Sequence, residues 1–545
     1  MACPGSNPPL QRPTEPSRTT VTISAFMTIQ GQTTDKIPIM GYWPCTPFAA
    51  SGNVPAPDES ETYHVTEPWL VLKFGGTSVS GKQQWETIAS LASQRLEDGN
   101  RVLLVCSAVS GITNALEALA DHAHNYDAGE VLSIQERHRR LSADLEIEAE
   151  DLINSAGEEI SRLLAQISNA PDQNCRDAAV ASLLSMGEWM STRIGERYLA
   201  RTLSVEWVDA RQALQALPEP GTSTRRSRLS ARCQSGADPV LVQNWLKKPA
   251  LLITQGFVAE HPEGGTALLG RGGSDTSAAL LASRVEAAHV EIWTDVPGLF
   301  SADPRVIPGA RLLQELNYDE ALEMAASGAK VVHSRCIRAA ADANIPVLIR
   351  DLGQPGFPGT TIRCDDVSGT GNLEGIRSVC RQSQMAVLLL QNLDTREHVG
   401  FLAWVFMQIS EAGVSVDLVA TSETTTTVAL NRVSNQIDDA TLDKLAECLR
   451  ERCAVTVHPH CSGINLVGRG ARVALKDIDS ESGFFAGHPL LMLSQSANDL
   501  CISILLHSQD ADELLGILHT ALIEKGLNPV ATSGVFGPSW QEIQN

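Results

Sequence analysis

Long apolar runs, paired cysteines and positive charge are the three features in which this sequence is poor. No uninterrupted apolar run approaches the roughly 20 residues that a membrane-spanning helix needs, and the N-terminus shows no basic stretch followed by an apolar one. The 12 cysteines are scattered without a CxxC pair, which is typical of reduced, buried thiols rather than of a disulfide framework. We therefore expect a cytoplasmic protein that is not inserted in a membrane.

The charge balance is strongly acidic. Lys and Arg number 42 against 64 Asp and Glu, which gives a formal net charge of −22. Nucleic acid or an anionic membrane would require a basic face, so neither is expected as a main partner. An anionic substrate would instead have to be held by a few local cations. The length is sufficient for about three domains with cores of their own.

The pattern of apolar residues divides the chain into regions. The first 66 residues are rich in Pro, Ser and Thr without sustained apolar periodicity, so we expect disorder there. From Trp69 to about Ile362, short apolar runs alternate with helical stretches, as in a layered α/β domain. Two shorter units follow, around 385–457 and 464–531, and their pattern indicates a tandem β-α-β-β repeat. In the α/β region the clearest expected strands are 101–106, 250–257, 289–295 and 345–351, and the expected helices are 83–95, 112–123 and 128–167.

A buried strand followed by a glycine-rich, cationic turn is expected at residues 69–78, WLVLKFGGTS. Backbone N–H groups of Gly75 and Gly76 can approach a phosphate closely, and Lys73 adds a point charge that can follow a transferring phosphoryl group. The next residues, GTSVSGK, match the first seven positions of a P-loop, but Gln83 stands where Ser or Thr would ligate magnesium. The segment therefore indicates ATP chemistry without a P-loop, with an ordinary strand and turn as the alternative.

Two further segments are suited to anions. A strand is followed by SAVSGITN, in which Ser107 and Thr113 suit a carboxylate or phosphate, although a helix-capping turn explains the segment equally well. A helix expected to begin near Thr276 is preceded by GRGGSD, whose backbone would form an anion cradle in which Arg271 can pair with a carboxylate. Asp275 either caps this helix or orients a lysine.

Two later loops carry polar residues that suit a nucleotide. One is WTDVPGLFSADPR, which contains Thr294, Asp295, Asp303 and Arg305. Such Pro-Gly loops are also ordinarily just solvated. The other is GAKVVHSR, whose Lys330 together with Lys73 could neutralise the charge on a γ-phosphoryl group in flight. A lysine in a turn is weak evidence by itself, and the nearby His333 is better explained by packing or hydrogen bonding.

The order of these motifs resembles that of aspartate kinases. In chain order they are KFGGTS, SAVSGITN, the GE of SMGEWMS, TQGF, GRGGSD, WTDVPG with DPR, and GAKVVH. The resemblance implies an α/β fold: an amino-acid-kinase three-layer sandwich at 67–365, followed by two ferredoxin-like (ACT) α+β regulatory domains at 383–458 and 462–534. Residues 535–545 would be a tail or a linker. Because family members occur fused to homoserine dehydrogenase or diaminopimelate decarboxylase, this chain could be the kinase part of a bifunctional enzyme.

The resemblance also implies roles for single residues. Those that carry phosphoryl transfer would be Lys73, Asp275 and Lys330. Those that bind aspartate would be Ser107, Thr113, Glu188, Phe257 and Arg271. In that pocket Arg271 would pair with a carboxylate and Glu188 would face the amino group. Those that bind ATP would be Lys73, Gly75, Gly76, Thr294, Asp295, Phe300, Asp303, Arg305 and Lys330. No metal ligand is implied, and Mg²⁺ enters with ATP.

The first C-terminal unit resembles the effector site of lysine-sensitive aspartate kinases. The implied effector residues are Gly400, Phe401, Leu402, Val416, Asp417, Thr421, Ser422 and Glu423, with weaker assignments at Thr395 and His398. Asp417 and Glu423 provide negative charge suited to an ε-ammonium. Four positions depart from the family pattern. Phe300 stands where Tyr is usual, which leaves a ring for the nucleotide but no hydroxyl, and Ser334 replaces a usual Pro. Trp189 and Met190 are bulkier than or different from the residues usual after Glu188.

The implied reaction transfers the γ-phosphoryl group of ATP to the β-carboxylate of L-aspartate to give 4-phospho-L-aspartate, the first step of lysine, threonine and methionine biosynthesis. The acceptor carboxylate, with a pKa of roughly 4, is already ionised at neutral pH, so the site needs no general base. L-lysine is the expected inhibitor, and edge-to-edge pairing of ACT units predicts a homodimer or larger assembly. The alternatives are a kinase of the same superfamily acting on a related acid and a non-catalytic amino-acid sensor.

Overall fold

The computed structural model describes residues 67–219, 221–329, 331–364, 374–391, 399–474, 489–525 and 534–544. The disorder expected at 1–66 and the roles expected of Lys330, Thr395 and His398 concern residues outside these ranges. Within them, no helix has both the length and the apolar character needed to cross a membrane.

An eight-stranded sheet with the order β3-β4-β2-β1-β7-β10-β11-β9 forms the centre of the first region. Its parallel middle strands are β4 (Leu251–Gln255), β2 (Arg101–Cys106), β1 (Trp69–Phe74), β7 (His289–Thr294) and β10 (Val347–Asp351). These are the apolar runs expected as strands, and β1, β2 and β4 are almost completely buried, as strands covered on both faces are. Because these strands are parallel, their carboxyl ends meet at one edge, where α/β sheets bind ligands.

The remaining strands complete the edges of the sheet. Short β3 (Val205–Trp207) lies parallel to β4. At the other edge β11 (Thr360–Arg363) is antiparallel to β10 and parallel to β9 (Glu315–Asn317). A separate hairpin is formed by β5 (Val258–Glu260) and β6 (Thr266–Leu268).

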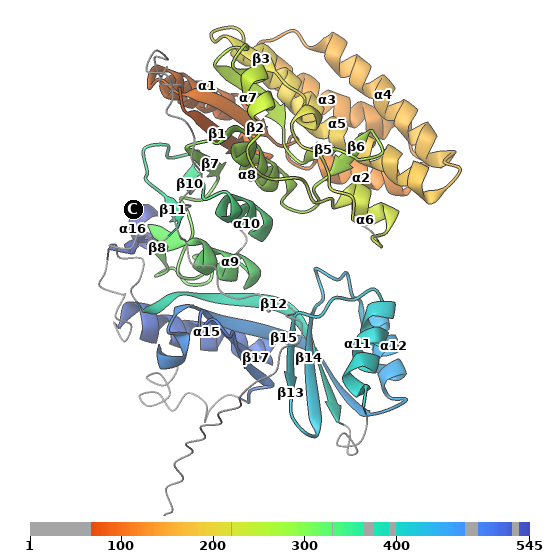
Figure 1. Ribbon diagram of the computed structural model, residues 1–545, viewed down its shortest axis with the longest axis vertical. Coiled ribbons are helices and arrows are strands. Elements are labelled where there is room, and N and C mark those ends of the chain that lie inside the picture. The colour runs from red at the N-terminus through yellow and green to blue at the C-terminus, as the bar shows by residue number, and fades with distance from the viewer. Residues whose placement is uncertain are drawn as a thin grey trace, which may run out of the picture. The chain divides into compact units, whose positions relative to one another are not determined.

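Helices cover both faces of the sheet and give the three layers that were expected (Figure 1). Alternate residues of β1 show this directly, because Leu72 packs with Trp85 in one core and Val71 packs with Leu281 in the other. The helices of the first core are α1 (Lys82–Glu97), α2 (Ile112–Asp121), α3 (Ala128–Asp144), α4 (Glu150–Ser168) and α5 (Gln173–Leu199). The helices of the second core are α7 (Pro239–Trp245), α8 (Gly273–Val285), α9 (Tyr318–Ala326) and α10 (Ser334–Asp342).

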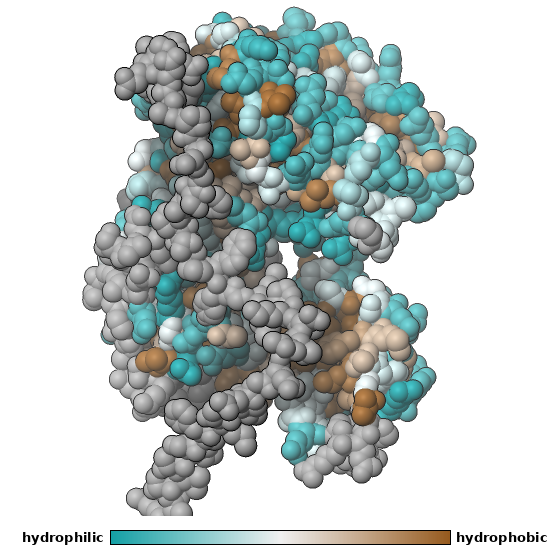
Figure 2. Space-filling view, in the orientation of Figure 1, coloured by the Kyte–Doolittle hydropathy of each residue, from teal (hydrophilic) through white to brown (hydrophobic). Residues whose placement is uncertain are grey.

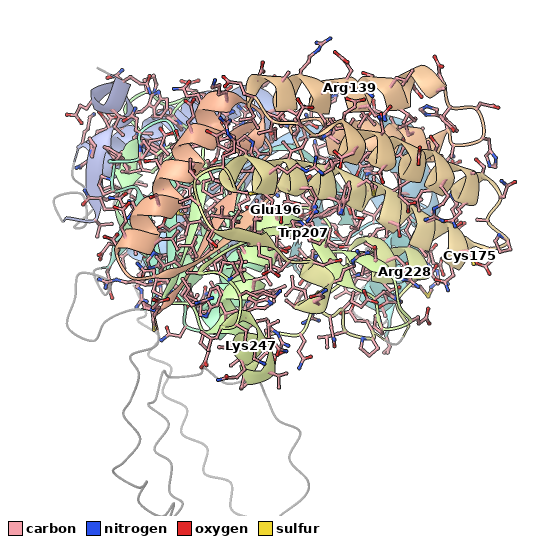
Figure 3. The ribbon with its side chains drawn as sticks, turned by 90° about the horizontal axis from the view of Figure 1, so that it is seen from above. Arg139, Cys175, Glu196, Trp207, Arg228 and Lys247 are labelled. Carbon is pink, nitrogen blue, oxygen red and sulfur yellow. The ribbon has the colours of Figure 1, made fainter. Side chains whose placement is uncertain are left out.

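The region expected as one helix at 128–167 is two helices, α3 and α4. Glu146 has φ of +57°, a left-handed conformation that an α-helix cannot continue through, and the chain reverses there. The long helix α5 is held to the sheet edge, since the backbone N–H of Trp207 donates to Glu196 Oε1 over 3.1 Å, and the two residues lie close together in Figure 3. This fixes the rotation of α5, which carries Glu188.

A six-stranded sheet with the order β13-β14-β12-β15-β17-β16 forms the C-terminal region. Its two long central strands, β12 (Gly375–Gln391) and β15 (Ala454–Arg469), run antiparallel along each other. The shorter strands are β13 (Leu418–Thr421), β14 (Thr425–Asn431), β16 (Met492–Gln495) and β17 (Cys501–His507). The helices are α11 (Phe401–Glu411), α12 (Asp439–Leu449) and α15 (Ala511–His519), and a π-helical turn, Thr520–Glu524, extends α15.

The two long strands are shared between two α+β units. The pairing of β12 with β15 shifts register between Gln382 and Val387, and Gln384 has φ of +58°. After this irregularity, residues 385–391 of β12 pair with β14. Before it, residues 375–382 of β12 pair with residues 463–469 of β15, and this part of β15 lies beside β17. The first unit is therefore continuous along the chain. The second unit takes its first strand from residues 375–382, which precede the first unit, so its strands are not confined to the expected 462–534.

The second unit packs directly on the N-terminal α/β region. Arg377 Nε of β12 lies 3.0 Å from Glu320 Oε1 of α9, and both side chains are at most 2% exposed. Asn465 Nδ2 of β15 donates to the Ser327 carbonyl over 3.3 Å. Ile464 and Leu514 belong to the same hydrophobic core as α8 and α9. The N-terminal α/β region and the C-terminal region thus share one core.

The end of the chain returns to the N-terminal α/β region. Residues 535–545 were expected to form a tail or linker, but Phe536–Ser539 is a strand, β18, that pairs with β8 (Arg311–Leu313), and a short helix, α16 (Trp540–Gln544), follows it. This pairing could not be predicted from the sequence, because β8 and β18 are short and lie far apart along the chain.

Candidate active site

An ion pair stands at the carboxyl end of β1. Lys73 Nζ lies 2.5 Å from Asp275 Oδ1, in the first turn of α8, and both side chains are 12% exposed. The helix starts at Gly273, earlier than the expected Thr276, and its N-cap is Gly272, so Asp275 is not the capping residue. Of the two readings considered for Asp275, the structure therefore shows the one in which it pairs with a lysine.

The glycines near Lys73 allow a close approach of two loops. A Cβ atom added to Gly76 would lie 2.9 Å from the carbonyl oxygen of Ala108, so only glycine lets the turn after β1 contact the loop after β2. The backbone N–H of Ser110 donates to the Gly76 carbonyl over 3.3 Å. Gly75 lies on the lysine side of this turn, where an added Cβ atom would be 3.5 Å from Lys73 Nζ.

The start of α8 is also packed through small residues. Gly272 has φ of +66°, and a Cβ atom there would overlap the side chain of His333. Phe257 packs against Gly273 and itself has φ of +68°, a conformation that costs a non-glycine residue roughly 1–3 kcal/mol. Its backbone N–H donates to Ser277 Oγ over 2.8 Å, which helps to hold that conformation. Phe257 and the helix start are thereby brought together.

A buried carboxylate faces the loop after β2. Glu188 of α5 is 3% exposed, and its Oε2 has no hydrogen-bond partner among the described residues. Burial raises the pKa of Glu188 to about 8, although the backbone N–H of Ala108 opposes the shift by donating to the carboxylate. An ammonium group placed beside Glu188 would supply the missing partner and restore the ionised form.

The same loop carries the expected hydroxyl residues. Ser191 Oγ, one turn after Glu188, donates to the Ser107 carbonyl over 2.6 Å, and this bond ties α5 to the loop. Thr113 is half-buried at the second position of α2, which begins after Gly111 in a left-handed conformation. Ser191 was not expected at the site, because the sequence does not show which residue a serine inside a helix will contact.

Arg271, which precedes the α8 N-cap, is exposed and makes no ion pair within the described part of the chain. Among the described residues, no carboxylate neutralises the charge of its guanidinium group. His333 caps α10 by accepting the backbone N–H of Arg335 over 3.2 Å, and burial lowers the pKa of this imidazole. This agrees with the structural role expected of His333. Ser334 is the first residue of α10.

The loop after β7 contains the expected nucleotide residues, and several of them pair with each other. Thr294 Oγ1 donates to Asp295 Oδ1 over 3.1 Å, and Arg305 holds Asp303 through two nitrogens at 2.9 and 2.8 Å. The ring of Phe300 is 7% exposed and packs edge-on against Trp540 of α16, with centroids 5.5 Å apart. Phe300 therefore joins the loop to the C-terminal helix, a contact that was not expected.

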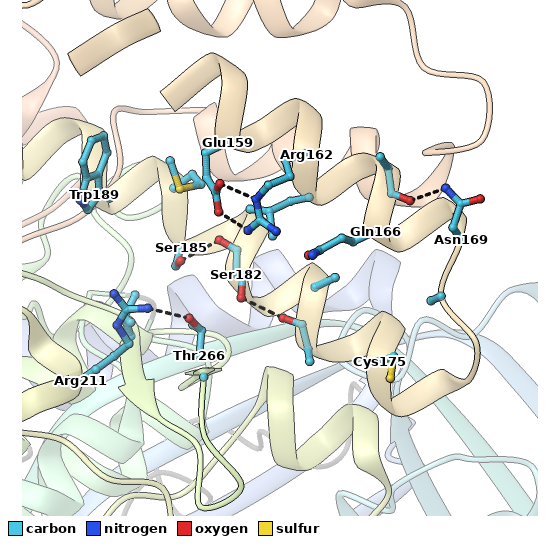
Figure 4. Close-up of a pocket in the computed structure, with 18 of the residues that line it drawn as sticks. Glu159, Arg162, Gln166, Asn169, Cys175, Ser182, Ser185, Trp189, Arg211 and Thr266 are labelled. Carbon is cyan, nitrogen blue, oxygen red and sulfur yellow. Dashed lines mark hydrogen bonds and ion pairs between the residues drawn. The ribbon is translucent and has the colours of Figure 1, made fainter. Parts of the chain in front are cut away.

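A cavity of about 1100 Å³ lies elsewhere, between α4, α5 and the β5–β6 hairpin (Figure 4). Its cations are already paired: Arg162 with Glu159 at 2.6 Å, and Arg211 with Asp209 at 2.6 Å. None of the expected site residues lines it. We place the candidate active site at the end of β1 rather than in this cavity, because only the former combines an oriented lysine with an unpaired buried carboxylate.

The expected effector residues lie at the start of α11 and around β13. Gly400, with φ of +92°, precedes α11, and Phe401 and Val416 both pack on the core of the first unit. Asp417 Oδ2 accepts the backbone N–H of Asn431 over 2.7 Å, and burial raises the pKa of Asp417. Leu402, Thr421, Ser422 and Glu423 are exposed. These residues therefore all belong to the first of the two C-terminal units.

Comparison with known proteins shows the class of protein to which this fold and this site belong. Residues 68–351 match the model of the amino acid kinase family. The chain belongs to that family of phosphotransferases, with its three-layer α/β fold followed by regulatory units.

The relatives identify the branch of the family. Lysine-sensitive aspartokinase 3 of Escherichia coli (strain K12) is 32% identical over 467 residues, which cover 84% of this chain and 99% of the relative. The crystal structure of E. coli aspartokinase III with aspartate and ADP (R-state) has a TM-score of 0.67 at 30% identity, and that with lysine and aspartate (T-state) has a TM-score of 0.63 at 30% identity. Each alignment covers 83% of this chain and 99% of the other. The chain is an aspartokinase.

Proposed function

We propose that this aspartokinase transfers the γ-phosphoryl group of Mg-ATP to the β-carboxylate of L-aspartate and is inhibited by L-lysine bound to the first ACT unit. The observation that carries the proposal is the Lys73–Asp275 ion pair at the end of β1. The E. coli structures with aspartate and ADP, and with lysine, support the choice of ligands.

In the proposed reaction an oxygen of the ionised β-carboxylate attacks the γ-phosphorus. The new O–P bond forms as the bond to the β,γ-bridging oxygen breaks, and ADP leaves with the electron pair. No proton has to be removed from the acceptor, so the site needs no general base. Lys73, held by Asp275, would stabilise the negative charge on the phosphoryl oxygens, and Lys330 is proposed as the second cation.

The substrate would be oriented by two opposite charges. Glu188 is proposed to accept the α-ammonium group, since its buried Oε2 has no other hydrogen-bond partner within the described residues. Arg271 is proposed to pair with the α-carboxylate, with Ser107, Thr113 and Phe257 completing the pocket. The carboxylates of the nucleotide loop are engaged by their neighbours, Asp303 by Arg305 and Asp295 by Thr294. We therefore treat Mg²⁺ as part of the Mg-ATP substrate rather than as an ion with ligands of its own in the chain.

Trapping aspartyl phosphate with hydroxylamine tests the proposed reaction. Purified protein is incubated with Mg-ATP and either L-aspartate or L-glutamate, with and without L-lysine. Hydroxamate formed from aspartate and suppressed by lysine is the expected result. Product from glutamate alone would favour a kinase acting on a related acid, and no product from folded protein would favour an amino-acid sensor.

Asp417→Asn tests the effector assignment. Removing a negative charge from the proposed ε-ammonium site is expected to raise the lysine concentration for half inhibition about tenfold, with kcat unchanged within about twofold. The matched control is Asp443→Asn, an exposed acidic residue on α12. Equal lysine sensitivity in the two variants would remove Asp417 from the site.

A homodimer through the first ACT unit is also proposed. Apolar side chains reach the surface at and just before α11 (Figure 2): Val399, Leu402, Phe406 and Met407 are each at least 37% exposed. Exposed apolar surface of this kind is typical of association sites. Sedimentation of the wild-type chain and of Phe406→Glu would test it, with a shift toward monomer expected for the variant.

A further inference from the structure

A buried histidine of the second ACT unit contacts the loop that carries the proposed nucleotide residues. His519, the last residue of α15, has a side chain that is 0% exposed. Its Nε2 lies 2.9 Å from Ser301 Oγ, and its Nδ1 lies 3.3 Å from Glu524 Oε1. Ser301 directly follows Phe300 in the loop after β7. The proposed catalysis does not use this fully buried polar side chain, so its role must be a different one.

Ser301 is fixed by backbone groups as well. Its Oγ accepts the N–H of Arg311 over 2.9 Å, and its carbonyl accepts the N–H of Val379 of β12 over 2.7 Å. Because Oγ already accepts one hydrogen bond, its own proton is available for His519 Nε2. The imidazole would then carry its proton on Nδ1 and donate it toward Glu524. The bond to Ser301 satisfies Nε2 of a neutral His519, whereas Nδ1 only approaches Glu524 Oε1 at 3.3 Å without a hydrogen bond of good geometry. Burial lowers the pKa of this imidazole.

The segment after His519 reaches the same loop at a second point. A Cβ atom added to Gly309 would lie 2.8 Å from Glu524 Oε1, so the carboxylate rests over the end of the loop. The stretch between Ser301 and Gly309 contains Asp303 and Arg305. The helix α15 therefore bonds this stretch at Ser301, and its π-helical extension lies against it at Gly309.

We propose that His519 is a positioning residue for nucleotide binding. It contacts neither the substrates nor the reacting atoms, and it acts by holding Ser301, and with it the loop that carries Asp295, Asp303 and Arg305. The inference rests on the proposed function only in assigning that loop to ATP. It also gives the second ACT unit a direct part in forming the nucleotide site.

The test measures KM for ATP, KM for aspartate and kcat in His519→Leu. Loss of the hydrogen bond to Ser301 is expected to raise KM for ATP about five- to tenfold, with kcat and KM for aspartate changed by less than about twofold. His519→Gln, which can keep a polar atom near Ser301, is expected to recover most of the affinity. Ser301→Ala is expected to match His519→Leu, and the double variant is expected to add little to either.

His138→Leu is the matched control. This histidine of α3 is also 0% exposed, and its Nδ1 lies 2.8 Å from the Ile134 carbonyl, in a different core. Both leucine variants are expected to lower the melting temperature, but only His519→Leu should alter KM for ATP. A fall in kcat at constant KM in both would reduce His519 to a structural role and overturn the proposal.

Titration with ADP, read by calorimetry, separates this inference from the proposed reaction. Wild-type protein that binds ADP but phosphorylates no aspartate would overturn the proposed reaction, and the ADP affinity of His519→Leu would still decide the role of His519. An unchanged ADP affinity in a folded His519→Leu protein would overturn the present inference. Wild-type protein that binds no ADP would overturn both.

Discussion

Lys73→Ala is expected to lower kcat by about 10³-fold or more, because the variant loses a cation that is proposed to stabilise the charge on the transferring phosphoryl group. The structure holds this lysine in place through Asp275 at 2.5 Å. Hydroxamate formation from aspartate measures the loss. The variant is also expected to lose stability, by about 3 kcal/mol, since the poorly exposed Asp275 is left without its partner. Rates are therefore compared per folded protein, as judged by circular dichroism.

Lys82→Ala is the control for Lys73→Ala. Lys82 occupies the lysine position of the P-loop-like run, but its side chain is 46% exposed and its Nζ pairs with Glu146 at 2.7 Å. We expect this variant to keep nearly full activity. If Lys82→Ala were inactive and a folded Lys73→Ala protein were active, the assignment of the phosphate-binding lysine would be reversed.

Glu188→Gln is expected to raise KM for aspartate about 30-fold or more, because the variant removes the charged partner of the substrate ammonium group while keeping the side-chain shape. The same change should make the protein more stable near pH 9. An ionised carboxylate buried at 3% exposure without a full set of partners destabilises the fold, and glutamine carries no charge. Opposite effects on binding and on stability would distinguish a substrate-binding carboxylate from a structural one.

The pH dependence of stability follows from the raised pKa of Glu188. Its pKa is about 8 in the folded chain against 4.5 as the ordinary value, so between these pH values the folded chain keeps a proton that the unfolded chain has released. The free energy of unfolding therefore falls as pH rises through this window, by roughly 4–5 kcal/mol in total. In Glu188→Gln this contribution disappears. Denaturant unfolding at pH 6 and pH 9 measures the difference.

The kinetic pH profile provides a second measurement. Ionised Glu188 is the form that binds an ammonium group, so kcat/KM for aspartate in the wild type should rise with pH up to about 8. The profile of Glu188→Gln should be lower and lack this rise. Glu196→Gln, which alters another carboxylate of α5, serves as control and should retain the wild-type profile. A rise that persists in Glu188→Gln would assign the titration to another group.

The parts of the site that the sequence predicted are those built from short, local motifs. Lys73 and Asp275 each lie where a strand or helix meets a glycine-rich turn, and this local chemistry is readable without a structure. Whether Asp275 caps its helix or pairs with a lysine was left open, and the structure shows the ion pair with Lys73. The helix at 128–167 was also recognised, but a single left-handed residue, Glu146, divides it, and glutamate carries no signal for that conformation.

The parts that could not be predicted depend on contacts between distant and weakly patterned segments. Phe300 suggested a ring against the nucleotide, whereas its neighbour in the structure is Trp540, near the end of the chain. Ser191 and His519 look like ordinary helix residues, and only the fold shows that they meet Ser107 and Ser301. The first strand of the second ACT unit, residues 375–382, was overlooked for a similar reason. It precedes the first ACT unit in the chain, although its partners belong to the second.

Because the two ACT units share strands β12 and β15, we expect that the first unit can be excised without breaking the second. Met385 is paired with Cys461 and Val387 with His458, so the two points at which the chain enters and leaves the first unit lie side by side. A two-residue hairpin turn can close such a gap between antiparallel strands. Replacing residues 386–459 by that turn would leave both halves of the second unit paired and His519 in contact with Ser301. The expected product is a kinase without the proposed lysine-binding unit, whereas truncation of the chain after the first unit would separate strand 375–382 from its partners.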